Sequence, residues 1–276
     1  MTNMNDFEKS QLANAVQQQT KRAKIIVAVN TKGGAGKSTV LINLAYCVSA
    51  KYKVLVVDAD EQGTSYNFCE VRKEEGMLVP DYMSFDKQIL KGNFDEGEEP
   101  VELLDLDDLV SKHQFDYDYI VIDTPGVDSV ITRMALTVAD TVFIPTGFTG
   151  FDINALARTI TIITECKNMV DNDPLVLILP NKIKKSATNV NKELKSEAYS
   201  ILQKTLNSFE TTVEEQKIFF MDSMISERSQ YARMHKGQTI FELVKGKTLN
   251  PTIEYRSIFA EMVRVEKQIN NNQEVV

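Results

Sequence analysis

One short stretch of the chain brings together the residue types that bind phosphate: glycines, lysines and hydroxyls. It directly follows the apolar run 25–29 and consists of Lys32, Gly33, Gly34, Ala35, Gly36, Lys37, Ser38 and Thr39. Glycines let backbone amides point at an anion, and a helix that begins here adds its positive end. Lys37 would neutralise terminal phosphates, and the Ser38 hydroxyl would hold Mg²⁺, which prefers oxygen ligands. The stretch predicts a loop that binds a nucleoside triphosphate; the alternative is a glycine-rich turn without nucleotide.

Polar residues also stand directly after other apolar runs. They are Asp58, Asp60, Asp123 and Asn181. In a parallel sheet the carboxyl ends of the strands meet at one edge, and ligands bind in the crevice outside that edge. We therefore expect these side chains and the loop 32–39 to form one site.

The apolar runs themselves are predicted to be strands. They are continuous, which is typical of strands buried on both faces of a parallel sheet, and they cover 25–29, 53–57, 119–122, 141–144, 175–179 and 217–220. Helical periodicity fills the gaps, notably at 153–170, 189–206 and 252–269. The expected fold is an α/β, doubly wound, mostly parallel sheet flanked by helices, in one domain over 23–276. Residues 1–22 are predicted to be a polar helix or a flexible lead.

Composition narrows the class of protein. Apolar residues make up 43% and charged residues 25% of 276 residues, as in ordinary globular proteins. No run approaches the roughly 20 apolar residues of a membrane span, and the polar start lacks an export signal, so we expect a cytoplasmic protein. Cys47, Cys69 and Cys166 are scattered, which argues against a disulfide framework or a metal knuckle.

The net charge of −8 is unfavourable for nucleic-acid binding, but it is concentrated in one segment. Eight carboxylates and no basic residue lie between positions 95 and 108, and without them the remainder of the chain is neutral. The acidic segment is predicted to be a solvated loop and helix start, and a basic face elsewhere remains compatible with the composition.

Two positions distinguish the loop from the general phosphate-binding pattern. Thr31 stands where the first glycine usually is, and Lys32 is an additional lysine too far from Lys37 to duplicate its role. In these residues the chain resembles the deviant Walker A loop of the ParA/MinD family, whose members are P-loop NTPases of the SIMIBI type. In that family the lysine that matches Lys32 contacts the nucleotide of the partner subunit. The resemblance extends over about 23–267 and implies an ATP-dependent homodimer.

The resemblance also implies roles for the carboxylates. Asp123 looks like a Walker B aspartate that binds Mg²⁺, with a capping aspartate at a turn as the alternative. The segment 58–63 resembles the family's switch segment, in which the second aspartate, here Asp60, orients the attacking water and the first, Asp58, lies near the metal. Asp60 is then the catalytic carboxylate, while Lys37, Lys32 and magnesium supply positive charge.

Three further positions bear on the resemblance. Asn181 matches the position at which relatives hydrogen-bond the adenine base. No Asn-Lys-x-Asp element is present there, which favours ATP over GTP. The alternative is that Asn181 is a turn residue, since asparagine is common in the turn after a strand. Glu61 and Gly126 stand where relatives have prolines. These two departures concern the stiffness of the switch segments and leave the nucleotide chemistry intact.

Branches of the family differ in surface features. Membrane-attached members carry a C-terminal amphipathic helix, whereas the stripe at Ile258, Met262, Val265 and Ile269 is expected to pack on the core, so no membrane attachment is predicted. Nitrogenase iron proteins need a cysteine pair that this chain lacks, and the nine tyrosines are dispersed, unlike the terminal cluster of the related tyrosine kinases.

Partition ATPases remain as the expected branch. In that group the ATP-bound dimer binds DNA without sequence preference, and a ParB-like or cargo-adaptor partner stimulates slow ATP hydrolysis. The implied task is to position plasmid or chromosomal DNA, with the protein on the nucleoid in its ATP state. A ParA-like positioner of a protein assembly is an alternative, and a metabolic P-loop ligase or kinase is another, against which Lys32 weighs.

Basic residues in the second half of the chain are candidates for contacts to DNA phosphates, with a solvated surface charge as the alternative for each. They are Lys182, Lys184, Lys185, Lys192, Lys195, Arg228, Arg233, Lys236, Arg256, Arg264 and Lys267.

Overall fold

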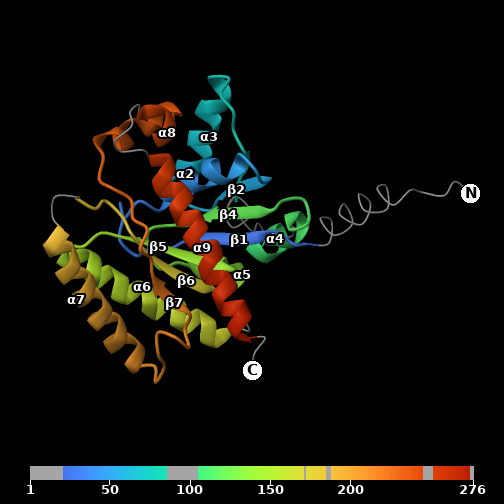
Figure 1. Ribbon diagram of the computed structural model, residues 1–276. Coiled ribbons are helices and arrows are strands. Elements are labelled where there is room, and N and C mark those ends of the chain that lie inside the picture. The colour runs from blue at the N-terminus through green and yellow to red at the C-terminus, as the bar shows by residue number, and fades with distance from the viewer. Residues whose placement is uncertain (1–20, 86–104, 171, 185–187, 245–250, 274–276) are drawn as a thin grey trace, which may run out of the picture.

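A parallel β-sheet forms the centre of the molecule (Figure 1). The computed structural model describes residues 21–85, 105–170, 172–184, 188–244 and 251–273. In this part of the chain the strand order is β3-β2-β4-β1-β5-β6-β7, and every strand pair is parallel. The strands are β1 (Lys24–Ala28), β2 (Val54–Asp58), β3 (Asp81–Ser84), β4 (Tyr119–Asp123), β5 (Thr141–Thr146), β6 (Leu175–Pro180) and β7 (Ile218–Phe220).

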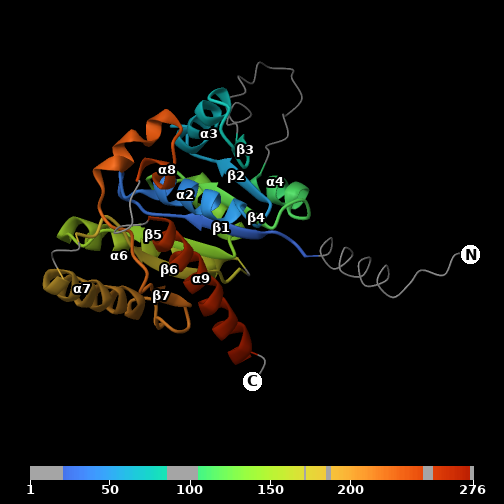
Figure 2. The same ribbon diagram turned by 45° about the horizontal axis from the view of Figure 1, so that its top comes forward.

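Helices connect the strands and cover both faces of the sheet. They are α2 (Lys37–Ser49), α3 (Thr64–Glu74), α4 (Leu106–His113), α5 (Val130–Val138), α6 (Gly150–Met169), α7 (Thr188–Asn207), the 3₁₀ helix η2 (Ser229–Lys236), α8 (Ile240–Leu243) and α9 (Pro251–Gln273). Figures 1 and 2 show α9 crossing one face of the sheet, with α6 and α7 displaced to the other side. Parallel strands require such crossover connections, because the chain must return to the same end of the sheet.

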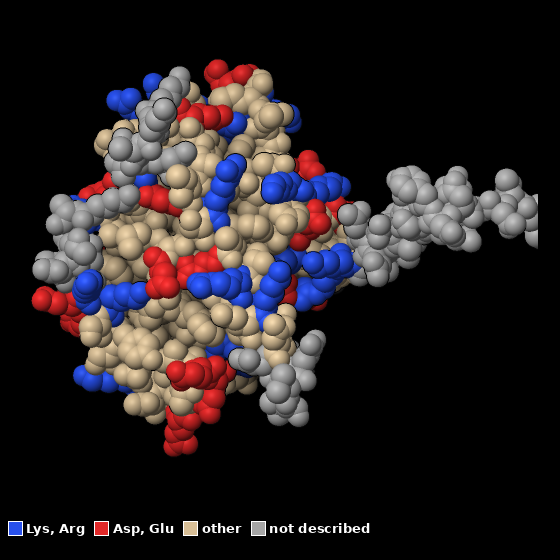
Figure 3. All heavy atoms as spheres, in the orientation of Figure 1, with Lys and Arg blue, Asp and Glu red and all other residues tan. Residues whose placement is uncertain are grey.

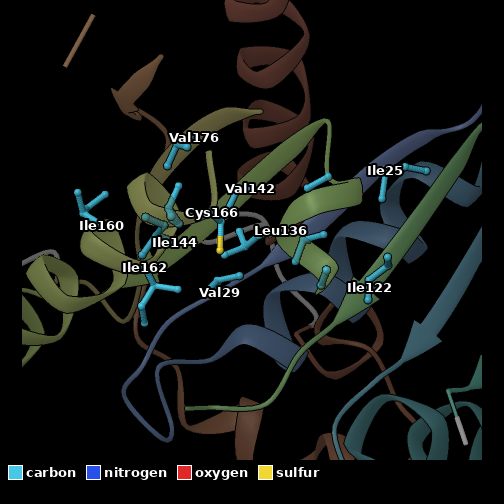
Figure 4. Close-up of a cluster of buried hydrophobic side chains, with 14 of the residues drawn as sticks. Ile25, Val29, Ile122, Leu136, Val142, Ile144, Ile160, Ile162, Cys166 and Val176 are labelled. Atoms are coloured by element: carbon cyan, nitrogen blue, oxygen red, sulfur yellow. The ribbon is translucent and has the colours of Figure 1, made fainter. Parts of the chain in front are cut away.

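Alternate residues of each strand pack into two separate cores, because successive side chains of a strand point to opposite faces. In β1, Ile25 and Val27 face the helices α4, α5, α6 and α7, while Ile26 faces α2 and α9. Figure 4 shows part of the first core, where Val142 and Ile144 of β5 lie near Cys166 of α6. Burial on both faces explains why the strands are continuously apolar in sequence.

The structure confirms the expected fold class and the six expected strands. The helices expected at 153–170, 189–206 and 252–269 are also present, as α6, α7 and α9. The apolar stripe of α9 packs on the sheet as expected, with Ile258 and Met262 fully buried. The lead expected at 1–22 lies outside the described residues except for its last two, and most of the acidic segment 95–108 also lies outside them.

One strand, β3, was not expected from the apolar runs of the sequence. It is short, polar and only partly buried, and it pairs with β2 alone at the edge of the sheet. An edge strand has one free side and needs no continuous apolar run, so periodicity gives no signal for it.

The carboxyl ends of three central strands lie level with one another. Ala28, the last residue of β1, is in register with Asp123 of β4, and Asp123 is in register with Asp58 of β2. The loop 32–39 therefore leaves the sheet beside two buried carboxylates, which positions the residues described next.

Candidate nucleotide-binding site

The loop after β1 has the backbone conformation that its glycines permit. Gly34 and Gly36 have φ values of 73° and 96°, in the left-handed region that other residues rarely adopt. Gly36 is also the N-cap of α2, and no side chain caps that helix. The first amides of α2 thus remain available to an anion, and the helix dipole favours one there.

Asn30, which the sequence analysis did not name, and Thr31, which stands at the place of the usual first glycine, hold the start of this loop. The Asn30 side chain donates to the Pro145 carbonyl over 2.8 Å and accepts a bond from the Lys32 amide, also over 2.8 Å. The Thr31 amide donates to the Thr159 hydroxyl of α6 over 3.1 Å. The loop is therefore anchored to β5 and α6, elements more than 100 residues away in sequence.

A cavity of about 730 Å³ opens beside the loop. Its lining residues come from the loop, the switch segment, the turn after β4 and the segments after β6 and β7: Gly33, Gly34, Gly36, Lys37, Ser38, Thr39, Asp60, Gln62, Thr64, Gly126, Val127, Asn181, Lys182, Glu227, Arg228 and Tyr231. A Cβ added to Gly33 or Gly34 would meet no atom within 4 Å, so this side of the loop is open space. Six of the eight loop residues, Asp60 and Asn181 thus line one cavity, whereas Lys32, Ala35, Asp58 and Asp123 are not among its lining residues.

Lys37 is buried at the base of this cavity. Burial lowers the pKa of its ammonium, while the negative charges of Asp123 and Asp60 act in the opposite direction. A Cβ on Gly126 would stand 3.3 Å from the Lys37 Nζ atom, so the glycine that replaces a family proline leaves room for the lysine. A buried lysine next to open space is suited to neutralise an anion.

Asp123 is 1% exposed and lies at the end of β4. Its Oδ2 atom accepts a 2.6 Å bond from the Ser65 hydroxyl, while its Oδ1 atom has no hydrogen-bond partner among the described residues. Burial raises the pKa of Asp123 to about 6, and the nearby hydroxyls of Ser38 and Ser65 partly offset that rise. A buried carboxylate oxygen without a partner fits a divalent cation held together with the Ser38 hydroxyl.

The two aspartates of the switch segment differ in environment. Asp58 is buried, and its oxygens accept bonds from the amides of Asp60 and Tyr66 over 3.0 and 2.8 Å. Burial raises its pKa and these amides oppose the rise. Asp60 lies on the cavity wall and accepts a 3.1 Å bond from the Gln62 amide. Asp58 therefore shapes the turn that presents Asp60 to the cavity.

Lys32 is not among the residues that line the cavity. Its Nζ atom lies 2.5 Å from Oδ1 of Asp152, which also caps α6 through Thr149. Burial by itself would raise the pKa of Asp152, but the bonds from Lys32 and Thr149 outweigh it and keep the pKa below its usual value. Asp152 gave no sequence signal, because it pairs with a residue 120 positions away.

The expected adenine contact, Asn181, lies at the cavity but uses its amide group for the loop. Its Nδ2 atom donates to the Ala35 carbonyl over 2.8 Å, and the side chain is almost fully buried. Lys182 follows it and also points to the loop, where its ammonium donates to the Gly34 carbonyl over 2.6 Å. Lys182 is thus part of the nucleotide site, a location that its selection as a surface lysine did not anticipate.

Arg228, a candidate for DNA contact, is engaged within the subunit. Its side chain is 6% exposed and makes a bidentate ion pair with Glu254, over 2.7 and 2.8 Å. A guanidinium that is already desolvated and paired is costly to redirect to a DNA phosphate. The sequence gives no signal for this pair, because the partner carboxylate lies 26 residues later, on α9.

Most of the other basic candidates are exposed, and Lys185 lies outside the described residues. Lys184 and Lys195 each lie 3.8 Å from a carboxylate, Glu227 and Asp222 respectively. On the face that carries α9, lysines and arginines lie beside acidic residues and do not form one continuous basic patch (Figure 3). This face of a single subunit is therefore a weak site for a polyanion.

A family model for ATPase MipZ matches residues 24–170, more than half of the chain. The chain belongs to this MipZ/ParA family of ATPases. The match covers the loop, the switch segment, β4 and Asp152, and it confirms the resemblance drawn from the sequence. Within the helices of the described residues, none is long and apolar enough to cross a membrane.

Relatives of the MipZ/ParA family include proteins of known name and solved structure. The sporulation initiation inhibitor protein Soj of Bacillus subtilis is 28% identical over 176 residues, which cover 55% of this chain and 70% of Soj. A Cyanothece McdA variant in complex with ATP superposes with a TM-score of 0.60 at 17% identity, covering 87% of this chain and 97% of McdA. The structure of pNOB8 ParA bound to nonspecific DNA superposes with a TM-score of 0.53 at 17% identity, and the match covers 89% of this chain and 99% of pNOB8 ParA. These structural likenesses confirm the fold.

Proposed function

We propose that this chain is an ATP-dependent, dimerising partition ATPase that binds nonspecific DNA in its ATP state and hydrolyses ATP to position plasmid or chromosomal DNA. The observation that carries the proposal is the place of Lys32. Its ammonium pairs with Asp152, and Lys32 is not among the residues that line its own cavity. Phe151, next to Asp152, and Val127, which follows the Gly126 that lies against Gly33, expose 80% and 58% of their surface. A cation among exposed apolar side chains suits a face that closes against a second copy.

The proposed chemistry assigns one task to each side chain of the cavity. Lys37 and the amides of the loop hold the phosphates, and Ser38 and Asp123 hold Mg²⁺, with Asp58 behind Asp123. When bound, the metal supplies positive charge to the phosphate oxygens. Asp60 orients the attacking water, and Lys32 of the partner subunit adds charge at the phosphates. We place all of this in a single domain, residues 23–276.

The proposed DNA contact depends on dimerisation. Two weak basic surfaces on one dimer act together, so binding should depend steeply on both ATP and salt. Among the described residues, candidates for this surface are the exposed Lys184, Lys192, Arg233, Lys236, Arg256, Arg264 and Lys267 and the half-buried Lys195. The relative pNOB8 ParA, which binds nonspecific DNA, supports this proposal. A ParB-like or cargo-adaptor partner would stimulate slow hydrolysis and release the dimer into the cytoplasm.

A second candidate function is the positioning of a protein assembly by the same ATP cycle. Two relatives named maintenance of carboxysome distribution protein A favour it, one from Gloeobacter kilaueensis at 30% identity and one from Halothiobacillus neapolitanus at 24%. The cargo distinguishes this candidate from the first, and the chemistry of the cavity is common to both.

The test is a DNA-shift titration with ATP, ADP or no nucleotide at several salt concentrations. We expect wild type to bind DNA with ATP alone, Asp60→Ala to bind persistently with ATP, and Lys37→Ala never to bind. If wild type binds DNA equally well with ATP, with ADP and without nucleotide, the proposal that ATP controls DNA binding is overturned.

A second measurement addresses the dimer directly. Lys32→Ala should bind ATP but remain monomeric by light scattering, because its cation no longer reaches the neighbouring nucleotide. Lys51→Ala, which removes an exposed lysine remote from the cavity lining, is the matched control and should dimerise normally. Normal dimerisation of Lys32→Ala would remove the role proposed for that residue.

A further inference from the structure

Two residues that follow β6 donate hydrogen bonds to two successive carbonyl groups of the phosphate-binding loop. Asn181 Nδ2 donates to the Ala35 carbonyl over 2.8 Å, and Lys182 Nζ donates to the Gly34 carbonyl over 2.6 Å. The two donors are neighbours in sequence, and so are the two acceptors, at a separation of 146 and 148 residues. We call this pair of residues, Asn181 and Lys182, the 181–182 clamp.

Holding these carbonyls also sets the direction of the loop amides. In a trans peptide the C=O and the following N–H point in opposite directions across one plane. A bond to the Ala35 carbonyl therefore turns the Gly36 N–H away from Asn181. A bond to the Gly34 carbonyl turns the Ala35 N–H away from Lys182, and this N–H donates to the Lys32 carbonyl over 3.3 Å, which closes the turn of the loop. Without these donors the carbonyl oxygens could rotate toward the cavity, where they would repel a phosphate.

The fit between the clamp and the loop leaves little room for change. A Cβ on Gly36 would stand 2.5 Å from Asn181 Nδ2, so the asparagine lies directly against the glycine backbone. The Asn181 Oδ1 atom accepts the Lys182 amide over 2.9 Å, which links the two clamp residues to each other. Both nitrogen donors thus approach the loop from one support, the end of β6, a strand paired on both sides with β5 and β7.

Lys182 adopts a backbone conformation that its residue type disfavours. Its φ is 59°, in the left-handed region, where a side chain with a Cβ crowds the following carbonyl. A residue adopts such an unfavourable backbone conformation only when contacts with the surrounding structure hold it there, and residues of this kind cluster at functional sites. Here the conformation directs the long side chain back across the cavity to the loop.

We propose that the 181–182 clamp holds the phosphate-binding loop in its anion-binding conformation before nucleotide arrives, and that Lys182 is a positioning residue of the nucleotide site. This inference rests on the ATP-binding part of the proposed function and is independent of DNA binding. It removes Lys182 from the DNA candidates, because its ammonium is engaged by the loop.

The test compares Lys182→Met, which keeps the side-chain length but removes the donor, with Lys184→Met, which removes an exposed lysine two residues later. Hydrogen exchange of the nucleotide-free protein is measured by mass spectrometry on the peptide that spans 30–40. We expect faster exchange of the loop amides in Lys182→Met alone. Its affinity for ADP should fall roughly threefold to tenfold, the scale of one ordinary net hydrogen bond, because the Lys182 ammonium is exposed to solvent. Because a lost charge could weaken ADP binding by itself, exchange without nucleotide is the deciding measurement.

A second variant separates positioning from general stability. Lys182→Gly relieves the left-handed backbone and removes the side chain, so its melting temperature should rise while its ADP affinity falls as in Lys182→Met. A residue with only a structural role would not give these opposite changes.

Two outcomes would overturn the clamp. One is loop exchange in Lys182→Met equal to wild type. The other is unchanged ADP affinity together with weaker DNA binding at saturating ATP, which would return Lys182 to the DNA surface. Failure of all variants and of wild type to bind DNA would instead count against the proposed function and leave the clamp intact.

Discussion

Replacing Asp123 by asparagine should stabilise the nucleotide-free protein while removing its response to magnesium. The carboxylate is 1% exposed, and one of its oxygens has no hydrogen-bond partner among the described residues. Its pKa rises from 3.8 to about 6 on burial, so the folded state binds a proton more tightly than the unfolded state does. Stability contributed by this group is therefore present at low pH and is lost as the pH rises from about 4 through 6.

The size of the effect follows from that shift. A difference of about two pKa units costs about 3 kcal/mol when the group is ionised in both states, at pH 7 and above. Asp123→Asn keeps the shape and removes the charge, so it should gain at most about 3 kcal/mol at pH 7 and less than about 1 kcal/mol at pH 4. Lys37 loses a compensating charge in this variant, which reduces the gain.

The assay is thermal unfolding of wild type and Asp123→Asn at pH 4, 5.5 and 7.5, with and without Mg²⁺ and ADP. A gain of this size raises the melting temperature by several degrees at pH 7.5. Magnesium and ADP should stabilise wild type more than the variant. The reasoning is refuted if the variant is less stable than wild type by the same amount at every pH, because burial of the charge would then carry no cost.

Three further outcomes are expected. Between pH 5 and 7 the affinity of wild type for Mg²⁺ in the presence of ADP should rise about tenfold more than that of Asp123→Asn, because a carboxyl with a pKa near 6 must lose its proton before it binds the metal. If the affinities of both proteins change in parallel with pH, Asp123 is not the ligand. Gly36→Ala should lose nucleotide binding, since φ is 96° and the new Cβ would meet Asn181, and isothermal titration of ADP checks this. Arg228→Met should lower the free energy of unfolding by about 3 to 5 kcal/mol, because the Glu254 carboxylate is left buried without its guanidinium partner. Urea denaturation measures this free energy, and a decrease below about 1 kcal/mol would contradict the expectation.

The sequence determines the nucleotide site where its signals are local. The strands β1, β2, β4, β5 and β6 are predictable because each is a continuous apolar run, and the residues that follow them lie at one edge for a topological reason. The loop is predictable because glycines and lysines at fixed spacing have few other uses. The structure adds the cavity that these segments share.

Contacts between distant segments are the part that sequence patterns do not reveal. Asp152 pairs with Lys32 across 120 residues, and no periodicity connects them. Lys182 and Arg228 were grouped as surface charges because composition gives only their charge. One binds the loop and the other is buried against Glu254. A charged residue acquires its role from its partner, and the partner is known only after the chain has folded.

Helix α3 joins the buried carboxylate of Asp123 to a remote part of the surface. At its first turn Ser65 donates to Asp123, and at its last turn Arg72 donates to the Gly237 carbonyl and to Glu242 at the start of α8. Eleven residues of helix form a stiff rod about 16 Å long. A cation at the Oδ1 atom of Asp123 would bind the carboxylate whose Oδ2 atom Ser65 holds, so a shift of this carboxylate pulls on the first turn of the rod and is passed on to the segment 237–242. The far end of α3 is therefore a place where a bound partner could sense which nucleotide the protein holds without touching it.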